Sequence, residues 1–360
     1  KDVKVNALNK EIEVLNEKAA SIDNNIQISL DINLQKYIQE IFTGKSGAVV
    51  VMDVNNGELL ASASFPEFDN NIFARGISVK EWNEMRNDFN HPFTNKIING
   101  LYPPGSVIKM GVALSFLDNG IGDNYNVNCS GSLTIGNRNF RCWKSTGHGS
   151  VNFRKAIAES CDDFFYKGSL KIGINKISHT LDKLGFGEQT GIDQINEFSG
   201  VNPNKEWKEK RYKEPWYVGE TVITSIGQGN MLVTPLQIAR YTSYIATGKL
   251  PKPHFYKANY EEPKDIGIPT KYLDVLRKGM YDVSYAQKGT ASRHINSKIT
   301  IASKTGTAQV VSIPQSEKVR MKESELQYYE RSHAWITTYG PFKNPQYVVT
   351  VLEEHGGHGG

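Results

Sequence analysis

The sequence has 360 residues, a formal net charge of +4 and 39% hydrophobic residues, a composition typical of a folded globular protein. The charge is only mildly basic and far from the dense basic stripe of a nucleic-acid-binding protein, so we expect no nucleic-acid partner. Three cysteines exclude a disulfide-dense scaffold. No apolar run approaches the roughly 18–20 residues that span a bilayer, so any membrane anchor is expected outside this sequence.

The first elements are predicted from spacing and turn residues. Residues 1–30 are polar, and we interpret them as the remnant of a separate, elongated module. A helix is predicted after Asp31, which can cap it, because Leu34, Ile38 and Phe42 recur at helical spacing. Two apolar runs, 48–52 and 58–64, flank an Asn-Gly turn and predict a β-hairpin.

The remaining elements predict the fold class. Helical patterns occupy 106–118, 151–172, 174–185 and 234–247, and strand-like runs occupy 300–311, 333–339 and 346–353. Strands therefore lie at both ends of the chain and helices lie between them. This order predicts an α+β fold in which the first and last segments close one antiparallel sheet. The sheet part would cover about 31–65 and 295–360, and the helical part about 106–290.

The first chemical motif contains Ser106 and Lys109, just after two prolines and a glycine. These residues would lie one helical turn apart on the same face. A serine hydroxyl becomes a good nucleophile only when a base removes its proton, and a lysine can be that base only when it is uncharged. Alone, this Ser-x-x-Lys pattern is weak, because it also occurs on ordinary helix surfaces.

The second motif is Ser160-Cys161-Asp162. A hydroxyl and a carboxylate two residues apart, in a short loop between helices, can face one cleft. The same residue types cap ordinary helices, and for this motif alone capping is the better explanation.

The third motif, Lys304-Thr305-Gly306-Thr307, lies within a predicted strand. Strict alternation would place the two threonines on one face and Lys304 and Gly306 on the other. On an edge strand the long lysine can reach round the edge, the hydroxyls can bind a carboxylate, and Gly306 leaves the backbone open to a substrate. The alternative is an edge strand that a lysine protects from pairing.

Together, in this order, the three motifs resemble the signature of penicillin-binding proteins and serine β-lactamases. The chain most resembles the transpeptidase domain of class B penicillin-binding proteins, of the elongation type called penicillin-binding protein 2, from about Ile26 onward. The resemblance is carried by residues 99–106, 159–166, 190–193, 207–216, 227–229 and 333–335. Asp162 stands where most of the family has asparagine, which favours the elongation-type branch.

The resemblance implies a fold and a reaction for residues 31–360. The fold would be a five-stranded antiparallel sheet flanked by helices, plus a helical subdomain. The reaction would be serine D,D-transpeptidation of peptidoglycan stem peptides, which β-lactams inhibit. Ser106 would be the nucleophile, Lys109 its base, Ser160 a proton relay and Asp162 the partner of Lys109.

In the same resemblance, Lys304, Thr305, Gly306 and Thr307 form the wall that binds the substrate carboxylate. The backbone N–H groups of Ser106 and Thr307 would form the oxyanion hole. The stretch 207–216 would be a loop near the active site.

The resemblance also implies partners and a location. The partners would be stem peptides, β-lactam antibiotics, a glycan-polymerising membrane protein of the SEDS type and a rod-shape scaffold protein. Residues 1–30 would belong to an N-terminal pedestal or dimerisation module that docks the protein partners. The location would be the periplasmic face of the bacterial inner membrane, with a single N-terminal transmembrane anchor that this chain does not include.

Two other functions stay open. A serine β-lactamase shares the motifs but needs a group that activates water, and the sequence contains no Glu-x-x-Leu-Asn segment. Fast rather than slow release of penicilloate would identify it. A β-lactam sensor or inactive scaffold would not cross-link stem peptides.

The three cysteines, Cys129, Cys142 and Cys161, fall close together in the sequence, with His148 between them. A predicted hairpin around residues 136–137 places Cys129 diagonally across from Cys142, about 7–8 Å away. That separation is long for a disulfide but suits two ligands of one metal. We therefore predict a tetrahedral Cys3His structural zinc site. A disulfide plus a buried thiol, or three inert cysteines with a surface histidine, are the alternatives.

Overall fold

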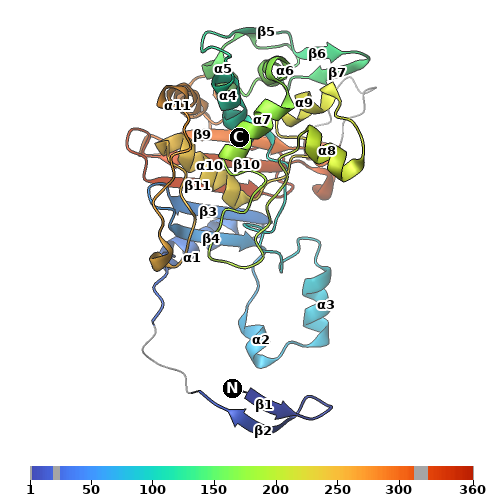
Figure 1. Ribbon diagram of the computed structural model, residues 1–360, viewed down its shortest axis with the longest axis vertical. Coiled ribbons are helices and arrows are strands. Elements are labelled where there is room, and N and C mark those ends of the chain that lie inside the picture. The colour runs from blue at the N-terminus through green and yellow to red at the C-terminus, as the bar shows by residue number, and fades with distance from the viewer. Residues whose placement is uncertain (1, 19–24, 312–322, 360) are drawn as a thin grey trace.

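A five-stranded antiparallel sheet forms the centre of the computed structural model, which describes residues 2–18, 25–311 and 323–359 (Figure 1). The strand order is β4-β3-β11-β10-β9. The strands are β3 (Gly47–Asp53), β4 (Leu59–Phe65), β9 (Ala302–Ala308), β10 (His333–Gly340) and β11 (Tyr347–Glu353). Since β3 pairs with β11, the first and last segments close the sheet. The predicted α+β class and antiparallel sheet are therefore confirmed.

Helices cover both faces of this sheet. Eleven α-helices occur in the described residues: α1 (Ile32–Phe42), α2 (Asn71–Arg75), α3 (Val79–Asn87), α4 (Lys109–Asp118), α5 (Phe153–Ala158), α6 (Asp162–Ile172), α7 (Ile174–Lys183), α8 (Lys205–Tyr212), α9 (Val218–Thr224), α10 (Pro235–Thr247) and α11 (Thr270–Tyr285). Val50 of β3 clusters with Leu236 of α10, while its neighbour Val49 clusters with Ile38 of α1. Side chains alternate along a strand, so both faces of β3 are buried, which explains its unbroken apolar run.

Local capping explains where several predicted helices begin and end. Asp31 accepts hydrogen bonds from the backbone N–H groups of Asn33 and Leu34 at the start of α1. Thr234 and Gln237 form a capping box at the start of α10, and Gly248 ends that helix in the left-handed conformation.

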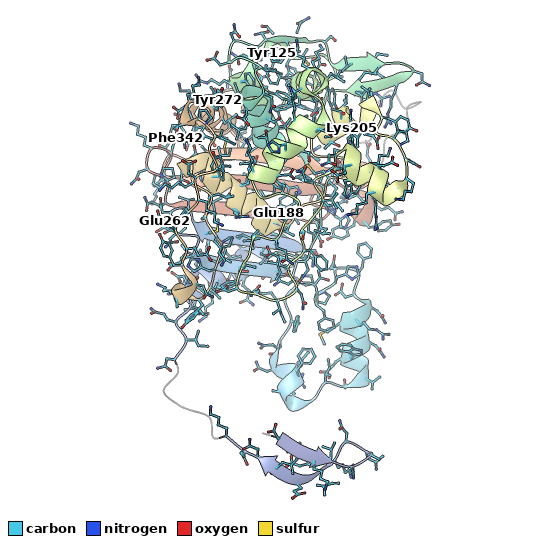
Figure 2. All side chains as sticks on the ribbon, in the orientation of Figure 1. Tyr125, Glu188, Lys205, Glu262, Tyr272 and Phe342 are labelled. Carbon is cyan, nitrogen blue, oxygen red and sulfur yellow. The ribbon has the colours of Figure 1, made fainter. Side chains whose placement is uncertain are left out.

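Helix α4 runs through the middle of the larger hydrophobic core. Every residue from Lys109 to Leu117 is buried, including Phe116, which packs near Phe164 of α6. A helix that is apolar all round belongs in a core, and here the only charged residue before its last is Lys109. Side chains fill the space between these helices and the sheet (Figure 2). The position of Lys109 is thus set by the packing of the whole helix.

Two short two-stranded sheets form a lobe above α6 (Figure 1). Strand β5 (Val127–Cys129) pairs with β8 (Gly149–Val151), and β6 (Ser132–Ile135) pairs with β7 (Arg138–Arg141). The Cys142 N–H donates to the Gly131 carbonyl at 2.8 Å. Gly131 therefore faces Cys142 one residue beyond the paired ends of β6 and β7, as the predicted hairpin requires. This lobe brings the cysteines together.

The N-terminal segment lies apart from the sheet. Strands β1 (Asp2–Val5) and β2 (Glu11–Asn16) form an exposed hairpin at the far end of the molecule (Figure 1). Contact with the body begins before the predicted boundary at residue 31, because Ile28 bridges to Tyr256 and the Ser29 N–H donates to the Phe255 carbonyl.

Helices α8, α9 and α11 were not among the predicted elements. In particular, residues 205–212 form α8, so the stretch from 207 to 216 is mostly helical and not the loop that the resemblance implied. Within the part of the chain that the structure describes, no helix combines the length and apolarity needed to cross a membrane.

Candidate active site

The loop that carries Ser106 is pressed against the edge strand β9. A short 3-10 helix, Gly105–Ile108, leads directly into α4. Gly105 has φ +53, and a Cβ there would come within 2.5 Å of the Thr307 carbonyl oxygen. The Gly105 N–H also donates to the Gly227 carbonyl at 2.9 Å. Only glycine fits so close an approach, which holds Ser106 beside β9.

The Lys109 side chain is wholly buried and joins the first motif to the second. Its Nζ donates to Asp162 Oδ1 at 2.6 Å, to the Ser160 carbonyl at 2.9 Å and to Ser160 Oγ at 3.2 Å. All three ammonium donors therefore have acceptors. No hydrogen bond to the Ser106 hydroxyl is found within the described residues, so Lys109 contacts Ser160 and Asp162 but not the serine for which it is the predicted base.

Ser160 lies in a strained turn between α5 and α6, which we call the Ser160 turn (residues 159–161). Its φ of +52 is uncommon for a residue with a side chain and is typical of functional sites. Its hydroxyl lies 3.2 Å from Lys109 Nζ and 3.0 Å from Lys304 Nζ. The three motifs thus converge on the Ser160 hydroxyl, as their predicted roles require.

The third motif lies on β9, which is an edge strand as predicted. Lys304 is completely buried and reaches Ser160, while Thr305 Oγ1 contacts Thr290 Oγ1 at 2.7 Å. A Cβ at Gly306 would meet Val107 at 3.0 Å, so this glycine chiefly lets the loop before α4 pack on the strand.

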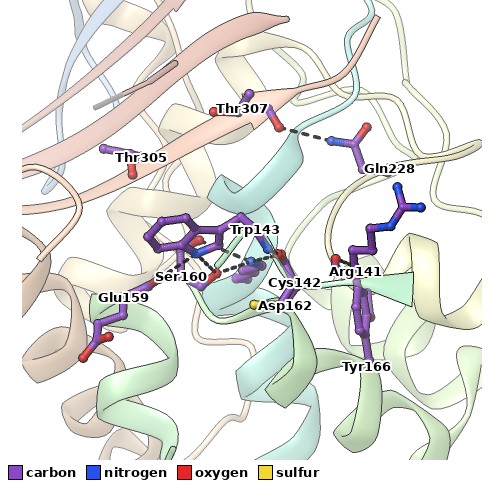
Figure 3. Close-up of polar contacts among 12 residues, drawn as sticks. Arg141, Cys142, Trp143, Glu159, Ser160, Asp162, Tyr166, Gln228, Thr305 and Thr307 are labelled. Carbon is purple, nitrogen blue, oxygen red and sulfur yellow. Dashed lines mark hydrogen bonds and ion pairs between the residues drawn. The ribbon is translucent and has the colours of Figure 1, made fainter. Parts of the chain in front are cut away.

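Thr307 is the member of the third motif nearest the Ser106 loop. It is half-buried, and its carbonyl accepts a hydrogen bond from Gln228 Nε2 at 3.1 Å (Figure 3). Gln228 belongs to the Gly-Gln-Gly stretch 227–229, and Gly227 in turn touches Gly105. Gly105, Gly227 and Gln228 therefore hold the Ser106 loop and β9 in contact.

The charges of the site are unbalanced. Two buried lysines face one buried carboxylate, Asp162. Burial raises the pKa of Asp162, and the Lys109 ammonium opposes that shift. Burial and the nearby Lys109 hold the pKa of Lys304 well below its usual range. An anionic group bound in this cleft would offset the cost of charging the two buried lysines, so the arrangement favours an anionic ligand.

Trp143 is a part of the site that sequence reasoning missed. Its backbone N–H donates to Asp162 Oδ2 at 2.8 Å, and its indole Nε1–H donates to the Glu159 and Ser160 carbonyls at 3.0 and 3.1 Å. Figure 3 shows the indole beside Ser160. Trp143 therefore braces the Ser160 turn and occupies the second oxygen of Asp162. Its place next to Cys142 was visible in the sequence, but its contacts were not.

The four predicted metal ligands lie together behind the Ser160 turn. Cys129, Cys142, His148 and Cys161, which we call the cysteine cluster, are all buried, and their ligand atoms lie within 4.8 Å of one another. His148 Nδ1 is 3.5 Å from the sulfurs of both Cys129 and Cys142. All three cysteines are free. The Cys161 thiol, by hydrogen bonding, lowers the pKa of Cys142.

This cluster has the chemistry of a structural zinc site. Three sulfurs and one imidazole nitrogen are the usual Cys3His donor set, with bond lengths of about 2.0–2.3 Å. His148 is buried, and it turns Nδ1 toward the sulfurs of Cys129 and Cys142. The residues present therefore fit the ion that the spacing predicted.

Comparisons with known proteins agree with this geometry. The family model "Penicillin binding protein transpeptidase domain" matches residues 47–360. The peptidoglycan D,D-transpeptidase MrdA of Haemophilus influenzae is 37% identical over 99% of this chain and 57% of its own length.

Solved structures agree as well. A penicillin-binding protein 2 in complex with MreC from Helicobacter pylori is 47% identical, with a TM-score of 0.88 over 98% of this chain and 64% of that one. A chain in a structure described as "Structural coordination of polymerization and crosslinking by a peptidoglycan synthase complex" is 30% identical, with a TM-score of 0.79 over 99% of this chain and 64% of that one.

The chain thus spans less than two thirds of each of these relatives. Over that length the family match, the sheet order and the three motifs agree with one another. The chain therefore belongs to the penicillin-binding protein transpeptidase family, within its class B, penicillin-binding protein 2 branch.

Proposed function

We propose that this chain is the transpeptidase part of an enzyme that cross-links peptidoglycan stem peptides during cell elongation. The observation that carries the proposal is the meeting of Lys109 and Lys304 at the Ser160 hydroxyl, beside the loop of Ser106. A buried, charge-rich cleft of this kind is built for acyl transfer. The MrdA relative is named a peptidoglycan D,D-transpeptidase, which supports the reaction class.

In the first step, Ser106 Oγ attacks the carbonyl of the penultimate D-alanine of a donor stem peptide. Its proton passes to Lys109, which can act as the base only after giving up its own proton, and the new C–O bond forms a tetrahedral intermediate. The C–N bond then breaks, and terminal D-alanine leaves with a proton relayed from Lys109 through Ser160. Backbone N–H groups of Ser106 and Thr307 would stabilise the oxyanion, each by roughly 3–4 kcal/mol.

In the second step, an amine from a neighbouring stem peptide attacks the acyl-enzyme. Its proton returns through Ser160 and Lys109 to Ser106 Oγ as the ester bond breaks. In the first step, Lys304, Thr305 and Thr307 would bind the carboxylate of the terminal D-alanine until that residue leaves. A β-lactam follows only the first step, because its opened ring stays attached to Ser106 and blocks the amine.

A serine β-lactamase is the second candidate, because it uses the same nucleophile and base. The family assignment favours the transpeptidase. A β-lactam sensor or scaffold is the third candidate, and it would be acylated without cross-linking stem peptides. The fate of the acyl-enzyme separates the three.

We also propose that the cysteine cluster binds a structural zinc ion. The ion would be held by Cys129, Cys142, His148 and Cys161. When bound, it supplies a rigid cross-link and no catalytic chemistry. Cys161 lies between Ser160 and Asp162, so these residues would fix the Ser160 turn from behind.

Partners and location are proposed from the family. Helicobacter pylori penicillin-binding protein 2 is solved in complex with MreC, and another relative belongs to a peptidoglycan synthase complex. We propose a rod-shape scaffold protein and a SEDS-type glycan polymerase as the corresponding partners here. The exposed β1–β2 hairpin would belong to the docking module, and the full protein would be anchored at the periplasmic face of the inner membrane.

We expect a β-lactam to add one penicilloyl group to this protein, and peptide mapping to place it on Ser106. Ser106→Ala should take up none, whereas the control Ser297→Ala, an exposed serine, should react normally. An adduct on another residue, or none on folded protein, would contradict the assignment. Slow release of penicilloate, together with cross-linking of a D-Ala-D-Ala stem peptide, would exclude both the β-lactamase and the sensor.

Lys109→Met should lower the acylation rate by about 100-fold or more, since a general base contributes roughly 10²–10⁴. The change leaves the Asp162 carboxylate buried without its cation, which can destabilise the fold. The double variant Lys109→Met/Asp162→Asn removes that unpaired charge, so it tests the loss of the base in a stable protein. Asp162→Asn alone is the control and should stay within about tenfold of wild type, ~1.4 kcal/mol of barrier. Stopped-flow acylation and melting curves measure both properties. Survival of fast acylation in Lys109→Met would show that another group is the base.

Protein purified without chelator should contain close to one equivalent of zinc by elemental analysis. Cys129→Ser should lose most of it, because a closed site has no spare ligand, while the exposed His294→Ala should keep it. Less than about a tenth of an equivalent in wild type, with a Cys129–Cys142 disulfide on mapping, would refute the site.

Deletion of residues 1–16 should weaken binding of the scaffold protein at least tenfold without changing acylation by a β-lactam. The hairpin is exposed, and within the described residues its two strands pair only with each other, so its loss should leave the cleft intact. Surface plasmon resonance measures the first property and intact-mass kinetics the second. Unchanged scaffold binding would move the docking surface elsewhere.

A further inference from the structure

A small depression of about 260 Å³ lies beside the candidate active site. The end of α5 and the segment that follows α11 form its walls, with Glu159 and Lys288 among its lining residues. There the Arg154 guanidinium donates to Asp282 Oδ1 at 2.8 Å. Lys155 Nζ donates to the His148 and Ser150 carbonyls at 2.7 and 3.0 Å.

Glu159 differs from these neighbours because its carboxylate has no hydrogen bond or ion pair within the described residues. The residue is only 9% exposed, and yet neither carboxylate oxygen is among the fully buried atoms that lack a partner. The oxygens therefore reach solvent through the depression. Figure 3 shows the Glu159 carboxylate pointing away from Ser160. A carboxylate that has no partner in the protein and reaches solvent through a depression is available to bind a cationic group from outside.

The depression shares its rim with the reacting groups. Glu159 directly precedes Ser160, and the Thr290 N–H donates to the Ala158 carbonyl at 3.2 Å. Thr290 Oγ1 also contacts Thr305 Oγ1 at 2.7 Å. The depression is thus separated from the proposed carboxylate wall by a single residue, Thr290.

This rim is the side from which the acceptor must come. Under the proposed function, Thr305 holds the carboxylate of the terminal D-alanine, so the leaving amine departs on that side. By microscopic reversibility, the amine that resolves the acyl-enzyme enters by the same route. The depression therefore lies where the acceptor stem peptide would approach.

An incoming amine finds no unengaged carboxylate among the described residues of the cleft. An aliphatic amine is protonated near neutral pH, because its pKa is about 8–10. The cleft already holds the Lys109 and Lys304 side chains, and Asp162 is engaged by Lys109. A carboxylate just outside the cleft would therefore stabilise an incoming ammonium group.

We propose that Glu159 and its depression form the entry subsite for the acceptor, where the carboxylate binds the acceptor's ammonium group before that group loses its proton and attacks. The proposal rests on the proposed transpeptidase function. It adds the chemical class of acceptor that this entry subsite selects, a protonated primary amine. Glu159 takes no part in acylation, because the donor carbonyl and Ser106 react before the acceptor arrives.

The test compares nucleophiles with and without an ammonium group on one acyl-enzyme. A thioester analogue of the donor peptide loads Ser106, and the acyl group partitions among water, D-alanine, whose amine is protonated at pH 7.5, and methanol, which has no charged group. Glu159→Gln should raise the KM for D-alanine about tenfold and leave methanolysis and hydrolysis within twofold. Glu159→Asp should recover much of the loss. The matched control Glu40→Gln, an exposed glutamate on α1, should behave as wild type.

The outcomes separate this proposal from the function on which it rests. An unchanged KM for D-alanine in Glu159→Gln overturns the subsite. An equal fall in aminolysis and methanolysis also overturns it, because Glu159 would then only shape the Ser160 turn. Normal β-lactam acylation of the variant shows that it is folded. A wild-type protein that forms no acyl-enzyme overturns the transpeptidase itself, and the subsite with it.

Discussion

The buried ion pair between Lys109 Nζ and Asp162 Oδ1 is the interaction on which the candidate site depends. Helix α4 is buried on all sides, so the lysine at its start cannot reach water and must be compensated within the protein. The compensation comes from the Ser160 turn, which supplies both oxygens of Ser160, and from the first residue of α6, which supplies the Asp162 carboxylate. Packing of one apolar helix thereby fixes the distance between two motifs that lie far apart in the sequence.

Support for this pair comes from outside the cleft as well. Trp143 holds the second oxygen of Asp162 with its backbone and the Ser160 carbonyl with its indole ring. The indole also contacts His148 of the cysteine cluster, with ring centroids 5.3 Å apart. The cysteine cluster, Trp143 and the Ser160 turn therefore form consecutive layers behind the reacting groups. Pre-organisation of this kind limits the reorganisation that acyl transfer would otherwise require.

Local patterns predicted much of this architecture, and contacts between distant segments explain what they missed. The α1 cap, the β3–β4 hairpin and the gathering of the cysteines depend on residues close in sequence, so spacing predicted them. Helix α8 was missed because it is charged on most of its surface and lacks an apolar stripe. In α11, Gly279 interrupts the pattern, and the structure explains it: a Cβ there would meet Ile157 at 2.8 Å. The roles of Trp143 and Glu159 arise only from tertiary contacts, which spacing does not encode.

The place of β11 in the sheet has a consequence for synthesis. This strand is near the C-terminal end of the described chain, but it lies between β3 and β10 in the middle of the sheet. Strand β9 pairs with β10, so the wall that bears Lys304 gains its support only after β11 has inserted. Domains generally fold as units, and pairing of such distant segments is slow. A nascent chain therefore cannot complete the Lys304 side of the cleft before the residues of β11 have been made.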